Sequence, residues 1–384
     1  MIRPILRCLL PALLALSPLP TRAAFPAPGL LDAEVSRAMS STGTRGLAIA
    51  LIEHGQVQRV RSYGARNEAG DALQTDTIMY GASLTKTTFA YTVMQLVDEG
   101  LLDLDRPLAS YLPKPLPEYP SEDKYAPWSD LADDLRWRRI TARQVLSHSV
   151  GFANFAFLEP DGKLRLHFDP GARYAYSGEG FILLQFVLER GLGLEVGKVM
   201  RQRVFDRLGM TNTSMTWRAD FAGHLADGWK ADGSLEPHDE RSKVRAAGSM
   251  DTSIADLAKF AAALVRGEGL SAKARAQMVK PQLAITTASQ FPSLQPELAP
   301  TQRRKDLWAG LGVIVFDGAQ GRGFMKGGHN DSTGNMLVCL ERGQRCVLLL
   351  ANDVRAEAMF PALVKFVLGE AGTPWSWEYG AAAN

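Results

Sequence analysis

Apolar and polar residues alternate differently in different parts of the chain, and the pattern separates strand-like ends from a helix-like middle. Near the N-terminus, residues 46–67 predict two strands joined by a turn at His54 and Gly55. In residues 80–100, apolar side chains recur from Phe89 with the spacing of a helix that buries one face. The first third therefore predicts a strand pair followed by a long helix.

The middle of the chain predicts further helices, and the last third predicts strands. Residues 111–130 are rich in proline and predict a surface loop, and residues 285–306 look irregular. Helices are expected at 140–150, where Thr141 is the cap, at 180–193, and within 245–267 after a Ser/Thr/Asp turn, and a closing helix is expected at 358–370. Strands are expected at 310–316, 322–328, 334–340 and 345–352.

The simplest architecture for these segments is an α/β fold of the α+β type. A mostly antiparallel sheet would be built from both chain ends, flanked by helices, with a helical region inserted between them. The length of 384 residues by itself is compatible with one large domain or with two or three. We predict a single domain over residues 24–384, with a sheet part at about 29–80 and 250–370 and a helical part at about 81–249.

The first 23 residues differ in composition from the rest. Arg3 and Arg7 precede an apolar run at residues 8–19, and small residues follow up to Ala23. The run is too short to span a bilayer comfortably, so this pattern predicts a secretory signal peptide that is cleaved near Ala23. We therefore expect a secreted or periplasmic protein with no membrane segment after cleavage.

Charge and histidine spacing narrow the possible partners. The formal net charge of +2 derives from the N-terminal leader, which holds three arginines and no acid, so the mature region is close to neutral. That balance gives no support for a nucleic-acid partner. The six histidines show no metal-ligand spacing, so no metal or other cofactor is expected. The expected partner is a small-molecule or peptide substrate, and the oligomeric state is left open.

Two cysteines, Cys339 and Cys346, flank a predicted turn. If Arg342 and Gly343 form its tip, the two cysteines face each other across the strands at a separation that suits a disulfide. In an exported protein we predict that bridge. The alternative is a pair of reduced, buried thiols. A catalytic thiol is not expected, because no sequence pattern links a histidine to either cysteine.

The pattern S-x-x-K opens the helix at residues 80–100. Ser83 and Lys86 would lie on one helix face, one turn apart. A serine hydroxyl needs a base to become a nucleophile, and a lysine whose pKa is lowered by burial or by a second cation can be that base. The alternative is that Ser83 caps the helix and Lys86 is a solvated charge. Ser121 and Lys124 repeat the spacing in the proline-rich loop, where we interpret it as chance.

Two later segments carry further candidate chemistry. Tyr176 lies in a turn before an apolar helix, and Lys326 ends a strand and is followed by Gly327 and Gly328. Backbone amides made accessible by glycines can hold an oxyanion. Each segment alone is also explained by an ordinary turn. The nucleophile elbow G-x-S-x-G and the dinucleotide fingerprint G-x-G-x-x-G are both absent.

In their order along the chain, these segments resemble the serine β-lactamase and penicillin-binding-protein superfamily, in its class C β-lactamase and esterase branch. The resemblance runs from about residue 46 to residue 369 and implies a β-lactamase/transpeptidase-like fold. It is carried by "YGASLTKTTFAYTVMQLVDEG", "ITARQVLSHSVGF", "PGARYAYSGEGF" and "KGGHNDSTGNMLVCLERGQRCVLLLAN". Several extended matches in the right order are far more specific than any single motif.

The resemblance also implies a role for each candidate residue. Ser83 would be the acylated nucleophile and Lys86 its principal base. Tyr176 would hydrogen-bond both, and would activate the deacylating water or protonate the leaving group. Lys326 would lower the pKa values of Lys86 and Tyr176 and attract a substrate carboxylate. The backbone amides of Ser83 and His329 would form the oxyanion hole.

The chain departs from the pattern of this superfamily at two substrate-recognition positions. Gly178 stands where the family usually has an asparagine, and Gly327 replaces the threonine of Lys-Thr-Gly. His329 and Asn330 could supply some of the lost polar contacts, or they could simply shape the turn. The residues expected to contact substrate are Gly178, Gly327, Gly328, His329, Asn330 and Asn352.

Together these features predict an exported, metal-free serine hydrolase that forms an acyl-enzyme on Ser83. The expected substrates are an ester, a peptide or amide with a D-amino acid, or a β-lactam. One alternative is a class C-like β-lactamase proper. Another is a penicillin-binding or sensor homologue that is acylated without turnover, or one that no longer catalyses a reaction.

Overall fold

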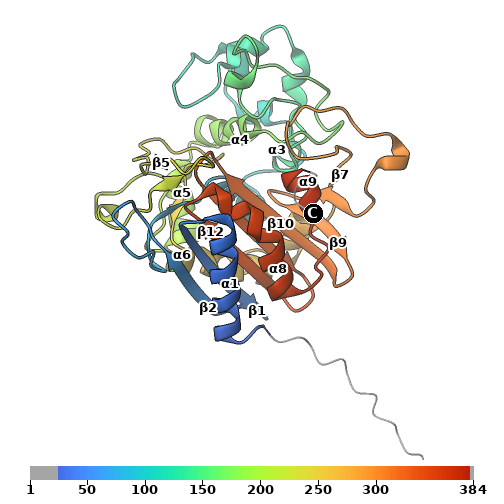
Figure 1. Ribbon diagram of the computed structural model, residues 1–384. Coiled ribbons are helices and arrows are strands. Elements are labelled where there is room, and N and C mark those ends of the chain that lie inside the picture. Colours follow the sequence, from blue (N-terminus) through green and yellow to red (C-terminus); the bar gives the residue numbers. More distant parts are fainter. Residues whose placement is uncertain (1–24, 381–384) are drawn as a thin grey trace, which may run out of the picture.

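A computed structural model describes residues 25–380 of the protein, so the predicted signal peptide lies outside the described residues (Figure 1). Its centre is an eight-stranded sheet with antiparallel pairings in the order β2-β1-β12-β11-β10-β9-β8-β7. The strands are β1 (Gly46–Glu53), β2 (Gln56–Gly64), β7 (Leu283–Ala284), β8 (Leu307–Ala309), β9 (Ile314–Gly318), β10 (Gly321–His329), β11 (Gly334–Leu340) and β12 (Arg345–Ala351). Because β1 pairs with β12, the two chain ends share one sheet, as the sequence predicted.

Helices cover both faces of this sheet. Helices α1 (Pro28–Thr42) and α8 (Phe360–Leu368) lie side by side on one face, and α2 (Leu84–Asp98) and α6 (Ile254–Arg266) pack on the other (Figure 1). Alternate residues of β1 join opposite cores: Leu47 packs with the α1 and α8 side, and Ala48 with the α2 and α6 side. Because both faces are covered, β1 is apolar along nearly its whole length instead of alternating.

The remaining elements build the helical region and the edges. They are α3 (Ala142–Leu146), α4 (Gly178–Gly191), α5 (Val196–Met200), a π-helical turn at Arg201–Phe205, α7 (Ala272–Val279), α9 (Trp375–Tyr379), and the short strands β3 (Met79–Tyr80), β4 (Gly228–Trp229), β5 (Leu235–Glu236) and β6 (Asp251–Thr252). Single 3-10 turns lie at Leu108–Tyr111, Leu116–Glu118, Trp128–Leu131, Leu135–Arg139, Ala156–Leu158, Ala219–Phe221, Pro300–Gln302 and Val354–Met359. The proline-rich segment 111–130 thus has no longer element, in agreement with the predicted loop.

The first described element is a helix that was not among the predicted elements. Helix α1 lies within the predicted sheet part, and its buried residues Leu31, Val35 and Ala38 follow a helical spacing. Pro28 at the start of that helix costs no backbone hydrogen bond, because the first amides of a helix have no partner within it. The apolar stripe is present in the sequence at a spacing that favours a helix.

The hairpin of β11 and β12 has the register expected from its turn. Cys339 pairs directly with Cys346, and Leu340 with Arg345. The two cysteine sulfurs are bonded, with a Cα–Cα distance of 4.1 Å. Both cysteines are buried, so neither is a candidate nucleophile.

Residues 25–380 lack two features, a membrane-spanning helix and a metal-binding cluster. Within that part of the chain, none of the helices combines the length and apolar character needed to cross a bilayer. The same residues contain no group of three or more histidine, cysteine, aspartate and glutamate side chains placed to hold a metal ion.

Candidate active site

Ser83 stands at the N-terminal end of α2, and its hydroxyl makes no capping hydrogen bond. Instead, the Nζ of Lys86 lies 3.0 Å from the Oγ of Ser83 and also donates to the carbonyl oxygen of Ala247 at 2.5 Å. The Lys86 residue is only 1% exposed. This arrangement excludes the alternative of a helix cap beside a solvated lysine.

The environment of Lys86 suits a base. Burial, followed by the positive charge of Lys326, lowers the pKa of Lys86 well below its usual value. Both causes disfavour the ammonium form, because a buried charge loses its hydration and a second cation repels it. Lys86 therefore gives up its proton at a much lower pH than a surface lysine.

Tyr176 lies between the two lysines. Its ring centroid is 4.9 Å from the Nζ of Lys86 and 5.1 Å from the Nζ of Lys326, and the Nζ of Lys326 is 3.4 Å from the phenol oxygen. The phenol also forms a hydrogen bond with Ser83. The structure thus brings together four side chains from three parts of the sequence: Ser83 and Lys86 at the start of α2, Tyr176 before α4, and Lys326 in β10.

The pKa values of Tyr176 and Lys326 respond mainly to burial. Burial lowers the pKa of Lys326 to about 8, while the charge of Glu378 acts in the opposite direction. Burial raises the pKa of Tyr176, and the hydrogen bond with Ser83 offsets only part of that rise. The expectation that Lys326 would lower the pKa of Tyr176 is therefore wrong, since desolvation of the phenolate dominates. Tyr176 remains a protonated phenol at neutral pH.

The imidazole of His148 packs against the ring of Tyr176. The two rings stack with centroids 4.4 Å apart and an interplanar angle of 23°. The Nδ1 of His148 accepts a hydrogen bond from the backbone N–H of Ser177 at 3.1 Å, which fixes the imidazole next to the tyrosine. Burial, Lys86 and Lys326 together lower the pKa of His148 well below its usual value, so the ring is neutral.

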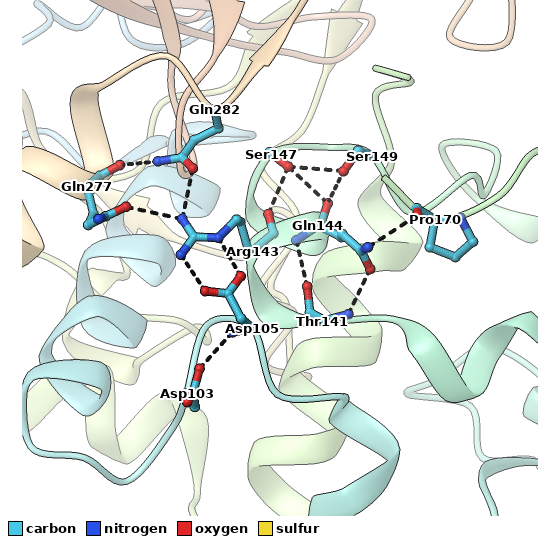
Figure 2. Close-up of polar contacts among 10 residues, drawn as sticks. All are labelled: Asp103, Asp105, Thr141, Arg143, Gln144, Ser147, Ser149, Pro170, Gln277 and Gln282. Atoms are coloured by element: carbon cyan, nitrogen blue, oxygen red, sulfur yellow. Dashed lines mark hydrogen bonds and ion pairs between the residues drawn. The ribbon is translucent and has the colours of Figure 1, made fainter. Parts of the chain in front are cut away.

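A polar network around α3 holds this region in place (Figure 2). Thr141 and Gln144 form a reciprocal capping box, and the Nε2 of Gln144 donates to the carbonyl oxygen of Pro170 at 3.2 Å. The turn after α3 then accepts backbone hydrogen bonds from Gly171 and Ala175. The loop that carries Tyr176 is therefore tied to α3 along most of its length.

Arg143 anchors the same helix on its other side. Its guanidinium pairs with Asp105 and donates to the side chains of Gln277 and Gln282, as Figure 2 shows. These contacts connect α3 to α7 and to the segment before β7. The framework behind Tyr176 is thus joined to the sheet part.

The four candidate catalytic side chains open into a pocket of about 380 Å³, a size that suits a small organic ligand. Strand β10 forms one wall, because β9 pairs with it only as far as Met325 and the following residues lack a strand neighbour on that side within residues 25–380. A side chain at Gly328 would come within 2.9 Å of the backbone nitrogen of Ser83, so glycine permits this close approach. His329 and Asn330 complete that wall.

A family model described as Beta-lactamase matches residues 31–367 of the chain. The chain belongs to the beta-lactamase family. The match confirms the resemblance on which the residue assignments depend. It ends before helix α9.

Known relatives in this family include esterases. The chain is 32% identical over 178 residues to a lovastatin esterase of Penicillium rubens, covering 40% of this chain and 44% of the relative. It is 27% identical over 207 residues to the esterase EstB of Burkholderia gladioli, covering 47% and 49%. The chain thus spans less than half the length of these curated relatives.

Solved structures support the fold. The octameric penicillin-binding protein homologue of Pyrococcus abyssi aligns with a TM-score of 0.71 at 19% identity, covering 90% of this chain and 78% of that one. At that identity the similarity shows the fold alone. The beta-lactamase fold predicted from the sequence is therefore confirmed.

The space left by the first departure from the family pattern is filled by an aromatic side chain. A side-chain carbon at Gly178 would lie 2.6 Å from the ring of Phe155, and the backbone N–H of Gly178 donates to the Oδ1 of Asn154 at 2.9 Å. Phe155 stacks on Phe157 with ring centroids 5.3 Å apart. Asn154, Phe155 and Phe157 line the pocket, whereas Gly178 does not. The expected substrate contact at Gly178 is therefore replaced by these neighbours.

The space left by the second departure is filled by a carboxylate. A side-chain carbon at Gly327 would lie only 2.1 Å from the Oε1 of Glu378, which belongs to α9. Glu378 lines the pocket together with Gln290 and Phe291. Glu378 lies beyond both the matched residues and the resemblance, so no motif pointed to it.

One expected contact is wrong. Asn352 does not line the pocket; its Nδ2 donates to the backbone carbonyls of Ala65, Arg66 and Asp227. This amide joins the end of β12 to two loops. The last residue of β12, Ala351, pairs with Gly334, which pairs with His329, so Asn352 lies at the pocket end of the sheet but two strands away from β10.

Proposed function

We propose that the protein is a serine hydrolase that forms an acyl-enzyme on Ser83, with carboxylic esters as its main substrate class. The observation that carries this proposal is the buried amine of Lys86, 3.0 Å from the Ser83 hydroxyl and inside a pocket shared with Tyr176 and Lys326. We further propose that the protein is exported, on the basis of the leader at residues 1–23.

The first half-reaction follows from the arrangement around Ser83. In neutral Lys86 one N–H still donates to the carbonyl oxygen of Ala247, and the lone pair can accept the hydroxyl proton. The Ser83 oxygen then attacks the ester carbonyl, and the backbone amides of Ser83 and His329 stabilise the oxyanion. Each such amide can contribute about 3 kcal/mol to lowering the barrier.

Collapse of the tetrahedral intermediate requires a proton for the leaving alkoxide. Tyr176, a protonated phenol hydrogen-bonded to Ser83, donates that proton and recovers one from the Lys86 ammonium. Water then attacks the acyl-enzyme, passes its proton to the same pair, and Ser83 is released with the carboxylic acid. Protons and electrons balance over the cycle without a cofactor.

The recognition residues favour esters over β-lactams. The family's asparagine and threonine positions are both glycine, and their spaces hold Phe155 and Glu378. The relatives named as esterases support the same substrate class. A class C-like β-lactamase remains the second candidate because the nucleophile, base and tyrosine are those of that branch.

A labelling experiment tests the proposal. The protein is treated with a fluorophosphonate probe, the labelled peptide is mapped, and turnover of p-nitrophenyl esters and nitrocefin is measured. We expect the label on Ser83, ester turnover, and loss of both in Ser83→Ala. Ser121→Ala, which removes the exposed serine of the second S-x-x-K sequence, is expected to behave as wild type.

Three results would contradict the proposal. Ester hydrolysis that persists in Ser83→Ala would remove Ser83 from the mechanism. Nitrocefin turnover well above ester turnover would favour the β-lactamase. A stable adduct on Ser83 that never turns over would favour the sensor.

A further inference from the structure

The carboxylate of Glu378 occupies the place where this family carries a threonine side chain. Its Oε1 lies 2.1 Å from the position that a Cβ at residue 327 would take. Glu378 is only 6% exposed, and its Oε2 accepts a hydrogen bond from the Nε2 of Gln290 at 3.0 Å. Because Glu378 lies this close to β10, next to Ser83, its carboxylate faces the part of the substrate that the family's threonine would contact.

The charges around this place differ from those of a carboxylate-binding subsite. Lys326 donates to the carbonyl oxygen of Gly327 and to the phenol of Tyr176, and its positive charge also acts on the carboxylate of Glu378. A negative charge near Lys326 offsets the positive potential that would attract a substrate carboxylate. Arg245 also lines the pocket, but its guanidinium donates to the backbone of Asp123 in an outer loop.

The pocket is also lined by three aromatic rings. Phe155, Phe157 and Phe291 offer large apolar surface and no charge. A substrate would therefore meet both aromatic rings and a buried acid. The groups in the pocket that could attract a free carboxylate are Lys326, His329 and Arg245, and the charge of Glu378 acts on the first two of these.

We propose that Glu378 determines specificity by excluding a free carboxylate from the subsite beside Gly327, so that the substrates are esters or amides whose leaving group is uncharged at that place. This inference rests on the proposed hydrolase function. The alternative is that Glu378 only holds α9 in position. Gln290 donates both its side-chain amide to Glu378 and its backbone N–H to the carbonyl oxygen of the neighbouring Trp377, so these contacts could serve packing alone.

A pair of substrates that differ in one group tests the inference. Both are phenyl esters of phenylacetic acid; one carries a carboxylate at the meta position of the phenol, and the other carries an uncharged carboxamide there. We expect the wild type to prefer the carboxamide in kcat/KM by roughly tenfold to hundredfold, as for one repelling charge several ångströms away. A wild type that hydrolyses both equally, or prefers the carboxylate, would overturn the inference.

The variant Glu378→Gln removes the charge and keeps the shape. Its preference should shrink toward unity through faster hydrolysis of the carboxylate ester, while the carboxamide ester changes little. Glu370→Gln makes the same change of charge at an exposed site paired with Lys365, and it should keep the wild-type ratio. If the ratio of kcat/KM for the carboxamide ester to that for the carboxylate ester is unchanged in Glu378→Gln, Glu378 only holds α9 in position and does not determine specificity.

Two further measurements separate the possible failures. Fluorophosphonate labelling of Ser83 reports on the proposed function, so a labelled enzyme without selectivity refutes only the role of Glu378. The double variant Gly327→Thr/Glu378→Ala restores the family's threonine and frees the space that it needs. It should hydrolyse the carboxylate ester at least about tenfold faster than the wild type does. No gain in this variant, if folded and labelled, would also count against the inference.

Discussion

The pocket has two parts that the sequence revealed to very different degrees. The reacting part consists of Ser83, Lys86, Tyr176 and Lys326, all of which were candidates from spacing and order, and all of which line the pocket. Of the residues around them, Gly327, Gly328, His329 and Asn330 were candidates and line the pocket, whereas the recognition part formed by Phe155, Phe157 and Glu378 was not foreseen. Chemistry restricts the residues of the reacting part to a few types, whereas recognition can be built from any side chain that fills the available space.

The difference also appears in how each part is supported. The reacting part lies between α2, β10 and the loop fixed by α3, and its four side chains are buried or nearly so. The recognition part comes from a loop with the exposed ring of Phe157 and from α9 near the C-terminus (Figure 1). We therefore expect substitutions in the reacting part to abolish turnover and those in the recognition part to change substrate preference.

The largest effect is expected from Lys86→Met. Removal of the base should lower kcat/KM for p-nitrophenyl esters by about 10³-fold or more. The melting temperature should not fall much, because a methionine of similar volume removes a buried amine and its desolvation cost. Steady-state kinetics measure the change in kcat/KM, and thermal unfolding measures the melting temperature.

A matched control exists in the second S-x-x-K sequence. Lys124 forms a partly exposed ion pair with Glu189 at 2.6 Å, outside the pocket. Lys124→Met should keep ester turnover while losing at most about 1 kcal/mol of stability. If Lys86→Met and Lys124→Met lose activity equally, the loss in Lys86→Met does not come from the position of Lys86 beside Ser83.

A smaller effect is expected from pH. Lys326 has its pKa lowered to about 8, so its positive charge is present below that pH and is lost above it. We expect kcat/KM to rise from acid pH as Lys86 loses its proton. It should fall by about tenfold above pH 8, where the ammonium of Lys326 that donates to the phenol oxygen of Tyr176 is lost. A guanidinium does not titrate in this range, so Lys326→Arg should flatten the alkaline limb.

The lowered pKa of Lys326 also makes the stability of the fold depend on pH. The lysine pKa is lower in the folded protein than its usual value of about 10.4, so the unfolded chain binds more protons between these two pH values. The contribution of Lys326 to the free energy of unfolding should therefore rise as pH increases from about 8 to about 10. For activity, a fall in kcat/KM above pH 8 that is identical in the wild type and in Lys326→Arg would contradict the assignment of that fall to Lys326.

The sequence predicted those features that depend on local pattern. The register that places Cys339 opposite Cys346 followed from a turn, and the helix of Ser83 and Lys86 followed from its apolar stripe. The features that it missed depend on contacts between distant segments. Glu378 reaches Gly327 only because α9 returns to β10, and burial, which no spacing reveals, raises the pKa of Tyr176. Asn352 was misplaced for the same reason, since its position in space depends on the loops around it.

The smallest effect is expected at the mouth of the pocket. Phe157 is 72% exposed and stacks on Phe155, so its ring is available to a substrate rather than needed for the core. Phe157→Ala should raise KM for phenylacetyl esters about twofold to tenfold, the size of one aromatic contact, and leave acetyl esters unchanged. Neighbouring Leu158 is 59% exposed and does not line the pocket, so Leu158→Ala should change neither. If both variants affect the two ester classes alike, the loop acts through its backbone, and recognition in this protein would depend on Glu378 more than on the aromatic rings.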